Sequence, residues 1–569
     1  MSNRRTYSMI IYFLASLVAH SGYAQDLKSL RNQKPFDIKG NVSATAQFYA
    51  VNGIENRRKP FTWYLTGSPT IKIYGIAIPF SITVSEQERS FSQPFNRYGA
   101  SPTYKWIKVH MGYRNVRFSD FTLGGAAFLG AGVELTPKNL RLGFVYGQFK
   151  RSVLEDDTGS DPRYKYLRPT YQRLGYGGKV GFGKPKAFVD FSFFKAVDIM
   201  NSIQNPSIKS GVTPMENLSI AAKTHFGFLK NRLVFDFDLG ASLLTKDIRK
   251  YDIKITDEWQ RTALKILAIN ETSAYFKAIK AGSSYRMKMA NIRLDYQRID
   301  PNFQTLGSYF FQNDIEQLTI SPSVSLIKGK ASLSGSLGRS RDNLNGKKTN
   351  TSIRKVGAIN AALQPVKNLN IALGYSNFGV GQSRGLADIF NDSLSISVVN
   401  SSYNGNLSYG FGSKSKRQSL ALNVALQSTT DYSQFSSALS GNASLMSSVN
   451  YSMNIPAHKI NVSGALSYVK MNTGGRKIIN IGPNFSATKT WKNGLYRTSL
   501  NHNSQARQTN GLNDGLMSNT GINLGTILKK QTLAIGLNYL YNQYKTQSDG
   551  LNFRNFSEYR GSVTYGVRF

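Results

Sequence analysis

The chain has 569 residues, a formal net charge of +39 and no cysteine. The lack of cysteine excludes disulfide bonds and a lipid-modified N-terminal cysteine. A soluble chain of this length would split into several domains with shifts in composition between them, and no such shift is visible. After the N-terminus there is also no apolar run long enough for a membrane helix, so a membrane-spanning form of this chain would cross with strands.

The N-terminus has the three parts of a secretory signal peptide. Arg4 and Arg5 precede an apolar run at residues 9–18, and a small-x-small cleavage pattern ends at Ala24. The run is well short of the roughly 20 residues that span a bilayer as a helix. We therefore expect Sec export with removal of residues 1–24, which leaves a net charge of 39 − 2 = +37.

Strand-like alternation begins shortly after the signal peptide. Residues 25–36 form a short polar stretch, predicted to be a periplasmic lead-in, and residues 37–569 are predicted to form a single outer-membrane β-barrel domain. Alternation is visible at residues 61–73 and 76–84. This architecture is all-β, because period-two alternation places one apolar face on each strand.

Two segments near the N-terminus have a less regular pattern. Residues 85–104 form a long polar segment. Residues 106–121 fit either a strand or an inserted loop that folds into the lumen, so the role of residues 104–122 stays open at this stage.

The alternation is clearest in the middle of the chain. Phe235 and Phe237 alternate with Asp236 and Asp238. Two carboxylates suit a strand with one face in lipid and the other in a water-filled pore, and they do not suit a strand buried on both faces. The residues predicted in this way to face the lumen are Arg141, Asp190, Asp236 and Asp238.

Tight turns punctuate the chain after Gly125, and each contains lysine. Between them lie longer polar connections, and this asymmetry is typical of outer-membrane barrels, in which the short turns are periplasmic and the long loops extracellular. The turns and the strands before them predict roughly 24 to 26 strands. The ten turns are at Pro137-Lys138-Asn139, Lys184-Pro185, Lys230-Asn231, 288–291, Lys328-Gly329-Lys330, Lys367-Asn368, 414–416, His458-Lys459, Lys492-Asn493-Gly494 and Lys529-Lys530.

The last strand ends the chain on an aromatic residue. Its apolar face is predicted to consist of Val563, Tyr565, Val567 and Phe569, opposite a face of small and polar residues. We expect this strand to close the barrel.

The sequence resembles the large outer-membrane β-barrels of the Bacteroidota, which are often basic, free of cysteine and closed by a C-terminal phenylalanine. The segment 61–69, followed by Pro79-Phe80 and by residues 95–102, has the character of a family signature. The resemblance implies a barrel in the cell outer membrane. The chain lacks the globular plug of TonB-dependent transporters and the periplasmic repeats of barrel-assembly proteins.

Few residues indicate chemistry. The four histidines beyond the signal peptide lack metal-ligand spacing. His225 lies in a strand next to the one that carries Asp236 and Asp238, so a His/Asp pair in the lumen or at the rim is one interpretation, but a catalytic site would also need a nucleophile or a second carboxylate pair in register. Isolated polar residues that face a wet lumen explain them better, so we predict no enzyme activity and no cofactor. Asp156, Asp157 and Asp161 form a weak candidate calcium site, but they lack the glutamate that completes an EF-hand. A solvated turn is the simpler explanation.

A basic and aromatic run follows these aspartates. Such a surface suits phosphorylated glycans or lipid headgroups, and the alternative is a loop that packs its own tyrosines over the barrel mouth. Residues 257–269 fit a short loop helix that covers the barrel. The candidate surface residues are Arg163, Tyr164, Lys165, Tyr166, Arg168, Tyr171 and Arg173.

Two functions from different classes fit these features. The first is a channel for anionic or bulky solutes, and the second is a non-enzymatic barrel subunit of an envelope machine for protein secretion or outer-membrane assembly. The expected partners are outer-membrane lipid and lipopolysaccharide, the barrel-assembly machinery during biogenesis and, for the second function, other envelope proteins. The positive charge does not indicate nucleic acid, because the chain is exported.

Overall fold

Alternating apolar and polar residues form strands along nearly the whole described chain. The structure, a computed structural model, describes residues 34–86, 96–155, 169–204, 206, 210–249, 268–308, 312–348, 350–384, 397–431, 441–544 and 555–569. The predicted signal peptide (1–24), calcium loop (156–161) and loop-helix residues 257–267 lie outside these ranges, so they stay predictions. Among the described residues no helix is both long and apolar enough to span a membrane.

The described strands follow one another along the chain, and four one-turn helices lie between them within the described ranges. The first strands are β1 (Phe36–Lys39), β2 (Asn41–Asn52), β3 (Phe61–Gly67), β4 (Thr70–Ile73), β5 (Ile76–Ser85), β6 (Arg97–Ala100), β7 (Thr103–Tyr104), β8 (Ile107–Arg117), β9 (Gly124–Leu135) and β10 (Leu140–Lys150). The next are β11 (Gln172–Lys184), β12 (Ala187–Ile199), β13 (Glu216–Phe228), β14 (Leu233–Thr245), β15 (Ser273–Arg286), β16 (Ala290–Ile299), β17 (Ile315–Leu326), β18 (Ala331–Arg341), β19 (Asn350–Leu363) and β20 (Leu369–Arg384). The last are β21 (Ser397–Gly412), β22 (Arg417–Asp431), β23 (Asn442–Ile455), β24 (Ile460–Thr473), β25 (Arg476–Trp491), β26 (Tyr496–Thr509), β27 (Leu512–Leu528), β28 (Gln531–Tyr544) and β29 (Phe556–Arg568). The helices are η1 (Met200–Ser202), η3 (Ile327–Gly329), η5 (Pro456–His458) and η6 (Lys492–Gly494).

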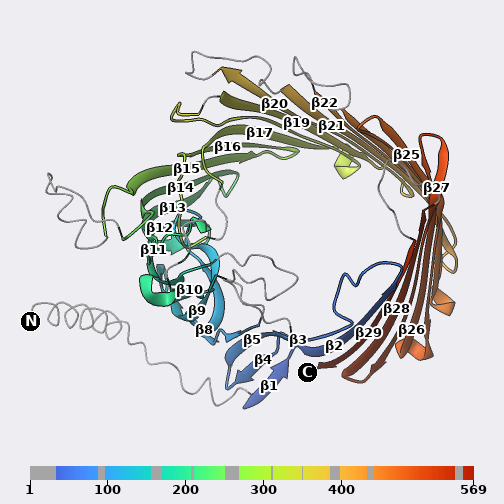
Figure 1. Cartoon of the computed structure of the whole chain (residues 1–569), viewed down its shortest axis with the longest axis horizontal. Helices are drawn as coiled ribbons and strands as arrows, with labels where there is room; N and C mark the ends of the chain where they lie inside the picture. Colours follow the sequence, from blue (N-terminus) through green and yellow to red (C-terminus); the bar gives the residue numbers. More distant parts are fainter. Residues whose placement is uncertain are drawn as a thin grey trace, which may run out of the picture.

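The strands close into one ring (Figure 1). Each strand from β8 onward pairs antiparallel with the next, and β29 pairs with both β28 and β2. Three pairs of short strands each fill a single position in the wall. β1 pairs with β4 and β2 with β3, and both β3 and β4 pair with β5. Likewise, β6 and β7 both pair with β5. The 29 described strands therefore occupy 29 − 3 = 26 positions. The predicted antiparallel barrel of roughly 24 to 26 strands is confirmed, with β29 as the closing strand.

Two N-terminal segments differ from the simplest interpretation of the sequence. The polar segment 85–104 contains β6 and β7, and Ser101 and Pro102 separate them. Each of these strands is too short for an alternation of apolar and polar residues to be visible in the sequence. The ambiguous segment 106–121 is mainly strand β8, and the chain then turns inward at residues 118–123.

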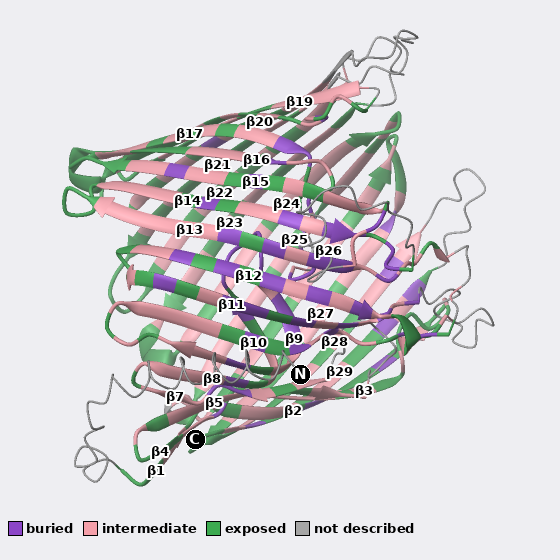
Figure 2. Cartoon of the chain, turned by 90° about the vertical axis from the view of Figure 1, so that its left-hand side faces the viewer, coloured by how far each residue is buried: buried purple, intermediate pink, exposed green. Residues whose placement is uncertain are grey.

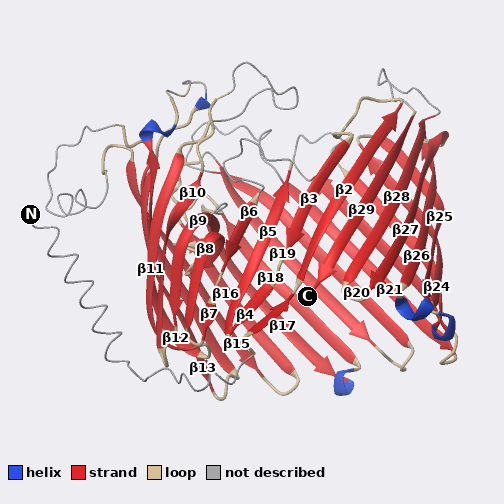
Figure 3. Ribbon diagram, turned by 90° about the horizontal axis from the view of Figure 1, so that it is seen from below, coloured by secondary structure: helices blue, strands red, loops and turns tan. Residues whose placement is uncertain are grey.

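All ten predicted lysine turns connect consecutive strands at one rim (Figure 3). Lysine itself often takes the left-handed backbone conformation there, for example Lys459 with φ of 50° and Lys529 with φ of 54°. The opposite rim carries the longer connections, but it also has two tight turns, at Gly474-Gly475 and at Asn510-Gly511. The expected asymmetry between the rims is therefore present but incomplete.

The outer face of the wall is apolar and the inner face is polar. In β12, Phe191 is 63% exposed on the outside, whereas Asp190 and Ser192 are buried on the inside. The same alternation in β22 exposes Leu420 and Leu422 to the outside. Strands that alternate in this way match transmembrane barrels, with lipid outside and a polar interior.

The large buried residues gather in one sector of the ring, from β8 to β17. Figure 2 shows many buried positions along the strands of this sector. One cluster is centred on Phe128, Phe149 and Phe194, and a second on Phe121 and Phe303. A barrel wall alone has no such core, so this sector must be covered from inside. The remaining wall has far fewer buried residues.

Candidate functional site

The segments that cover the core sector leave the wall and return to it. We call them together the inner pad: residues 118–123, between β8 and β9, and residues 300–308, after β16. They hold each other through a hydrogen bond of 2.6 Å from Thr305 Oγ1 to the Thr122 carbonyl and a short parallel bridge between Leu123 and Gly307. The rings of Phe121 and Phe303 meet edge to face at 5.6 Å between centroids.

The inner pad is bonded to the inward-facing polar residues of the wall. Ser119 Oγ donates to Asp238 Oδ1 at 2.6 Å, and the hydroxyls of Thr122 and Ser192 lie 3.0 Å apart. Ser242 Oγ donates to the Gln304 carbonyl at 2.6 Å. Buried polar groups must find partners, so these contacts explain why β12 to β14 carry polar residues beneath a covered surface.

Asp120 adds an ionic contact between the inner pad and β15. Its carboxylate accepts from Lys280 Nζ at 2.9 Å and also pairs with Arg117. Burial alone would raise the pKa of Asp120, but the hydrogen bonds from Lys280 and Arg117 outweigh it and hold this pKa below its ordinary value. Asp120 therefore stays charged at neutral pH.

The four residues predicted to face the lumen lie on the inward side of their strands, but they are engaged with protein groups. Arg141 forms a bidentate pair with Asp190, at 2.7 and 2.9 Å. Asp236 Oδ1 lies 2.6 Å from His225 Nδ1, and Asp238 binds Ser119 of the inner pad. All four side chains therefore have partners within the protein.

Tyr171 and Arg173 are buried, in contrast to the exposed binding surface predicted for them. Tyr171 is buried, and Arg173 forms a buried bidentate pair with Asp198, at 2.7 and 2.9 Å. The pairing partner is 25 residues away, so the local sequence pattern did not reveal it. Arg163, Tyr164, Lys165, Tyr166 and Arg168 lie outside the described residues, as do Asp156, Asp157 and Asp161.

Three polar residues that no local sequence pattern marks are linked in a chain: Ser101 between β6 and β7, His110 on β8 and Glu134 on β9. His110 Nδ1 lies 3.1 Å from Ser101 Oγ, and His110 Nε2 lies 3.0 Å from Glu134 Oε1. His110 is only 3% exposed and Ser101 is buried with it, so the hydroxyl does not face open space. The geometry fits a structural network that satisfies a buried imidazole.

On the other side of the ring lies a cavity of about 1330 Å³. Its wall is built from β22 to β29 and β2, and the connection at residues 53–60 between β2 and β3 turns into the ring beside it (Figure 1). The polar side chains that line it include Gln47, Ser419, Asn450, Ser452, Ser463, Asn484, Ser486, Asn501, Asn503, Asn519, Asn523, Asn538 and Ser562. We call this set the amide wall.

The amide wall results from the alternation of single strands. In β27, Asn519 and Asn523 alternate with the outward Ile522, and in β28, Asn538 alternates with the outward Leu537. Paired residues on adjacent strands point to the same face, so the asparagines of neighbouring strands come together. Asn484 lies opposite Asn503, which in turn lies opposite Asn519.

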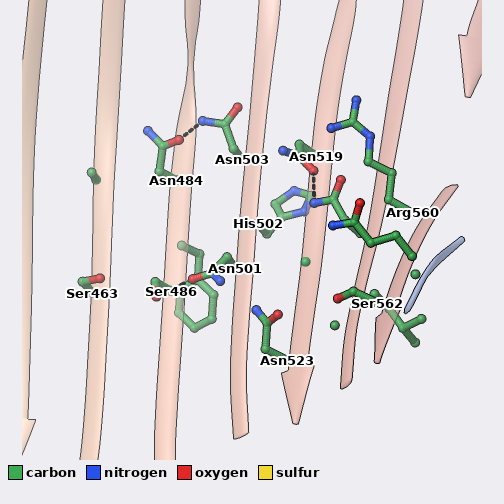
Figure 4. Close-up of a pocket in the computed structure, with 18 of the residues that line it drawn as sticks. Ser463, Asn484, Ser486, Asn501, His502, Asn503, Asn519, Asn523, Arg560 and Ser562 are labelled. Carbon is green, nitrogen blue, oxygen red and sulfur yellow. Dashed lines mark hydrogen bonds between the residues drawn. The ribbon is translucent and has the colours of Figure 1, made fainter. Parts of the chain in front are cut away.

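Hydrogen bonds between these side chains hold several amides in place (Figure 4). Asn538 Nδ2 donates to Asn519 Oδ1 at 2.7 Å, and Asn503 donates to Asn484. Ser486 Oγ donates to Asn501 Oδ1 at 2.8 Å. A carboxamide has two N–H donors and an oxygen acceptor, so each linked amide keeps groups that can bind a ligand in the cavity.

The basic side of the cavity comes from the connection 53–60 and from β29. Arg57, Arg58 and Lys59 line it together with Arg560. Glu558 is only 1% exposed, and it receives Arg57 Nη1 at 3.4 Å and Arg560 Nη2 at 2.5 Å. One buried carboxylate therefore faces two guanidinium groups.

The other two cations of the cavity differ in their pairing. Lys59 Nζ lies 3.3 Å from Glu86. Arg58 is exposed and has no ion pair or hydrogen bond with any residue that the structure describes. The excess is 4 − 2 = 2 positive charges, counting the two carboxylates that these cations contact.

Within the described ranges, no group of three or more His, Cys, Asp or Glu side chains is arranged to hold a metal ion.

Comparisons with known proteins find distant likenesses among solved structures. No protein-family model matches the sequence, and no curated protein matches it either. The P pilus usher (PapC) translocation pore has a TM-score of 0.35 and 12% identity, covering 94% of this chain and 99% of that chain. Acinetobacter baumannii OccAB2 has a TM-score of 0.31 and 11% identity, covering 67% and 97%. Pseudomonas aeruginosa OpdK with vanillate has a TM-score of 0.29 and 10% identity, covering 63% and 94%. At these identities and TM-scores, the likenesses identify no family, solute or partner for this chain.

Proposed function

We propose that this chain is an outer-membrane channel for anionic or bulky hydrophilic solutes. One observation carries the proposal: a closed ring encloses a large cavity lined by the amide wall and by four cations. A polar lining keeps the interior of a barrel wet, and pore selectivity follows from the charges and hydrogen-bonding groups that line the path.

The membrane and the orientation are part of the proposal. The apolar outer band and the predicted signal peptide support a location in the outer membrane of a Gram-negative cell. The segment 61–69, through its resemblance to large outer-membrane barrels of the Bacteroidota, supports a cell of that group. The lysine-turn rim is proposed to face the periplasm, because short turns lie there in outer-membrane barrels. Lysines at that rim would meet anionic headgroups of the inner leaflet, and lipopolysaccharide would contact the opposite rim.

The test is the conductance of the purified full-length protein in a planar bilayer, combined with a mild-detergent pull-down from its native membrane. We expect a barrel purified without stoichiometric partners to give steady currents with a preference for anions over cations. Stoichiometric partner proteins together with no steady current would contradict the channel and favour the subunit of an envelope machine.

A further inference from the structure

We propose that the cavity beside the connection 53–60 binds an acidic carbohydrate, a hydroxyl-rich oligomer that carries carboxylate or phosphate groups. The inference rests on the proposed channel function, of which it names the solute class. It combines two features of the cavity lining: the amide wall and the unbalanced cations beside it.

The amide wall suits sugar hydroxyls. A hydroxyl group both donates and accepts a hydrogen bond, and so does a carboxamide. Asn519 and Asn538 are linked at 2.7 Å, and Asn501 is linked to Ser486 at 2.8 Å, so the amides are oriented before a ligand arrives. Preorganised groups lose less entropy when they bind.

The cations add selectivity for acidic oligomers over neutral ones. Arg57 and Arg560 share the single buried carboxylate of Glu558, and Arg58 has no described partner. Guanidinium groups bind carboxylates and phosphates with paired hydrogen bonds. Glu55, in the same connection, is exposed but does not line the cavity, so it does not cancel this excess there.

The volume favours an oligomer. About 1330 Å³ exceeds the roughly 300–1,000 Å³ of ordinary small-molecule sites. The amide wall also extends across several adjacent strands, which offers successive sugar units equivalent hydrogen-bonding groups.

Equilibrium titration of the full-length protein in detergent tests the inference without any measurement of current. The probes are a hexamer of galacturonic acid, a phosphorylated malto-hexaose, unmodified malto-hexaose and inorganic phosphate. We expect one or both acidic hexamers to bind more tightly than the neutral hexamer and than inorganic phosphate, and the tighter of the two identifies the acidic group. Equal binding of acidic and neutral hexamers, no binding of any hexamer, or equal binding of inorganic phosphate would each overturn the inference.

Variants separate the two features. Arg58→Gln should weaken binding of the acidic hexamer about fivefold at low salt and leave the neutral hexamer unchanged, because Arg58 has no described structural contact to lose. Asn501→Ala combined with Asn523→Ala should weaken both hexamers. The matched controls, Arg232→Gln and Asn368→Ala, lie exposed on turns away from the cavity lining and should change neither. If Arg58→Gln had no effect, the cations would not select the ligand and the inference would fail.

The channel and its solute class can fail separately. Steady currents without preferential binding of an acidic hexamer would reject only the solute class. Binding without any current would retain the site and reject the channel.

Discussion

At the scale of single residues, buried ion pairs hold the polar inner face of the core sector together. Arg173 and Asp198 join β11 to β12 through two hydrogen bonds, with side chains only 6% and 4% exposed. Asp198 Oδ2 also accepts from the Met215 amide at 3.1 Å. Removing one charge would leave the other buried without compensation.

We therefore predict that Asp198→Asn lowers the free energy of unfolding by about 3–5 kcal/mol. Urea unfolding of the detergent-solubilised barrel, followed by tryptophan fluorescence, measures the change. The matched control is Asp295→Asn, because Asp295 pairs with Arg293 while both side chains are more than two-fifths exposed, and exposed pairs contribute only about 0–1 kcal/mol. Equal losses in the two variants would contradict the role given to burial.

The sequence distinguished the two faces of a strand, but it did not reveal the bonding partners of most inward-facing side chains. Arg141, Asp190, Asp236 and Asp238 all lie on the inward parity, and this parity follows from neighbours two positions away. The contacts of Arg141 with Asp190 and of Asp238 with Ser119 depend on segments that only the fold brings together. A pair between His225 and an aspartate of the next strand follows from the hairpin, and the structure selects Asp236. The same limit applies to Arg173, whose basic and aromatic neighbourhood suggested an exposed surface.

At the scale of elements, the inner pad depends on a glycine in β14. A Cβ atom built at Gly240 would lie 2.3 Å from the Cβ of Phe121. Glycine therefore permits the close approach of residues 118–123 to the wall, because any larger residue would displace Phe121.

We predict that Gly240→Val detaches the inner pad and leaves the wall closed. The overpacking costs about 1–3 kcal/mol, and the barrel should then show a larger single-channel conductance and faster proteolysis within residues 118–123. Gly357→Val in β19 is the matched control, since the nearest atom to its added Cβ is Leu337 Cδ2 at 3.6 Å. Unchanged conductance and proteolysis in Gly240→Val would show that this contact does not hold the pad.

The elements themselves were predictable to different degrees. Strands such as β14 and β28 show long alternation, and the lysine turns mark their ends. Strands β6 and β7 have four and two residues, which is too short for a period to be recognised. Residues 300–308 carry no local signal for inward packing, because only contacts with Asn217, Ser242 and the rest of the pad determine their place.

At the scale of the whole molecule, closure brings together residues more than 500 positions apart. Thr45 of β2 lies opposite Thr564 of β29, and their hydroxyl oxygens are 3.0 Å apart. A closed barrel has no unpaired strand edge, so this seam completes the hydrogen bonding of the backbone in the membrane.

The seam can be tested with cysteines, because the natural chain has none. We predict that the double variant Thr45→Cys, Thr564→Cys forms a disulfide on oxidation, since residues directly opposite in an antiparallel pair have the separation that a disulfide needs. The cross-link should change the mobility of the denatured chain in non-reducing gel electrophoresis. Each single variant should stay uncross-linked as a monomer, and failure of the double variant to cross-link in the membrane would contradict closure at β2 and β29.

By itself, the sequence determined the class of fold, the two faces of the strands and the rim with lysine turns. These features are encoded locally, in a period of two residues and in turn residues. Tertiary structure decided that the ring has 26 positions, that the inner pad covers one sector, and that asparagines from separate strands form one wall beside Arg57 and Arg58. The physical reason is register: alternation tells which face a side chain occupies, but only the pairing of distant strands determines which side chains share that face as neighbours.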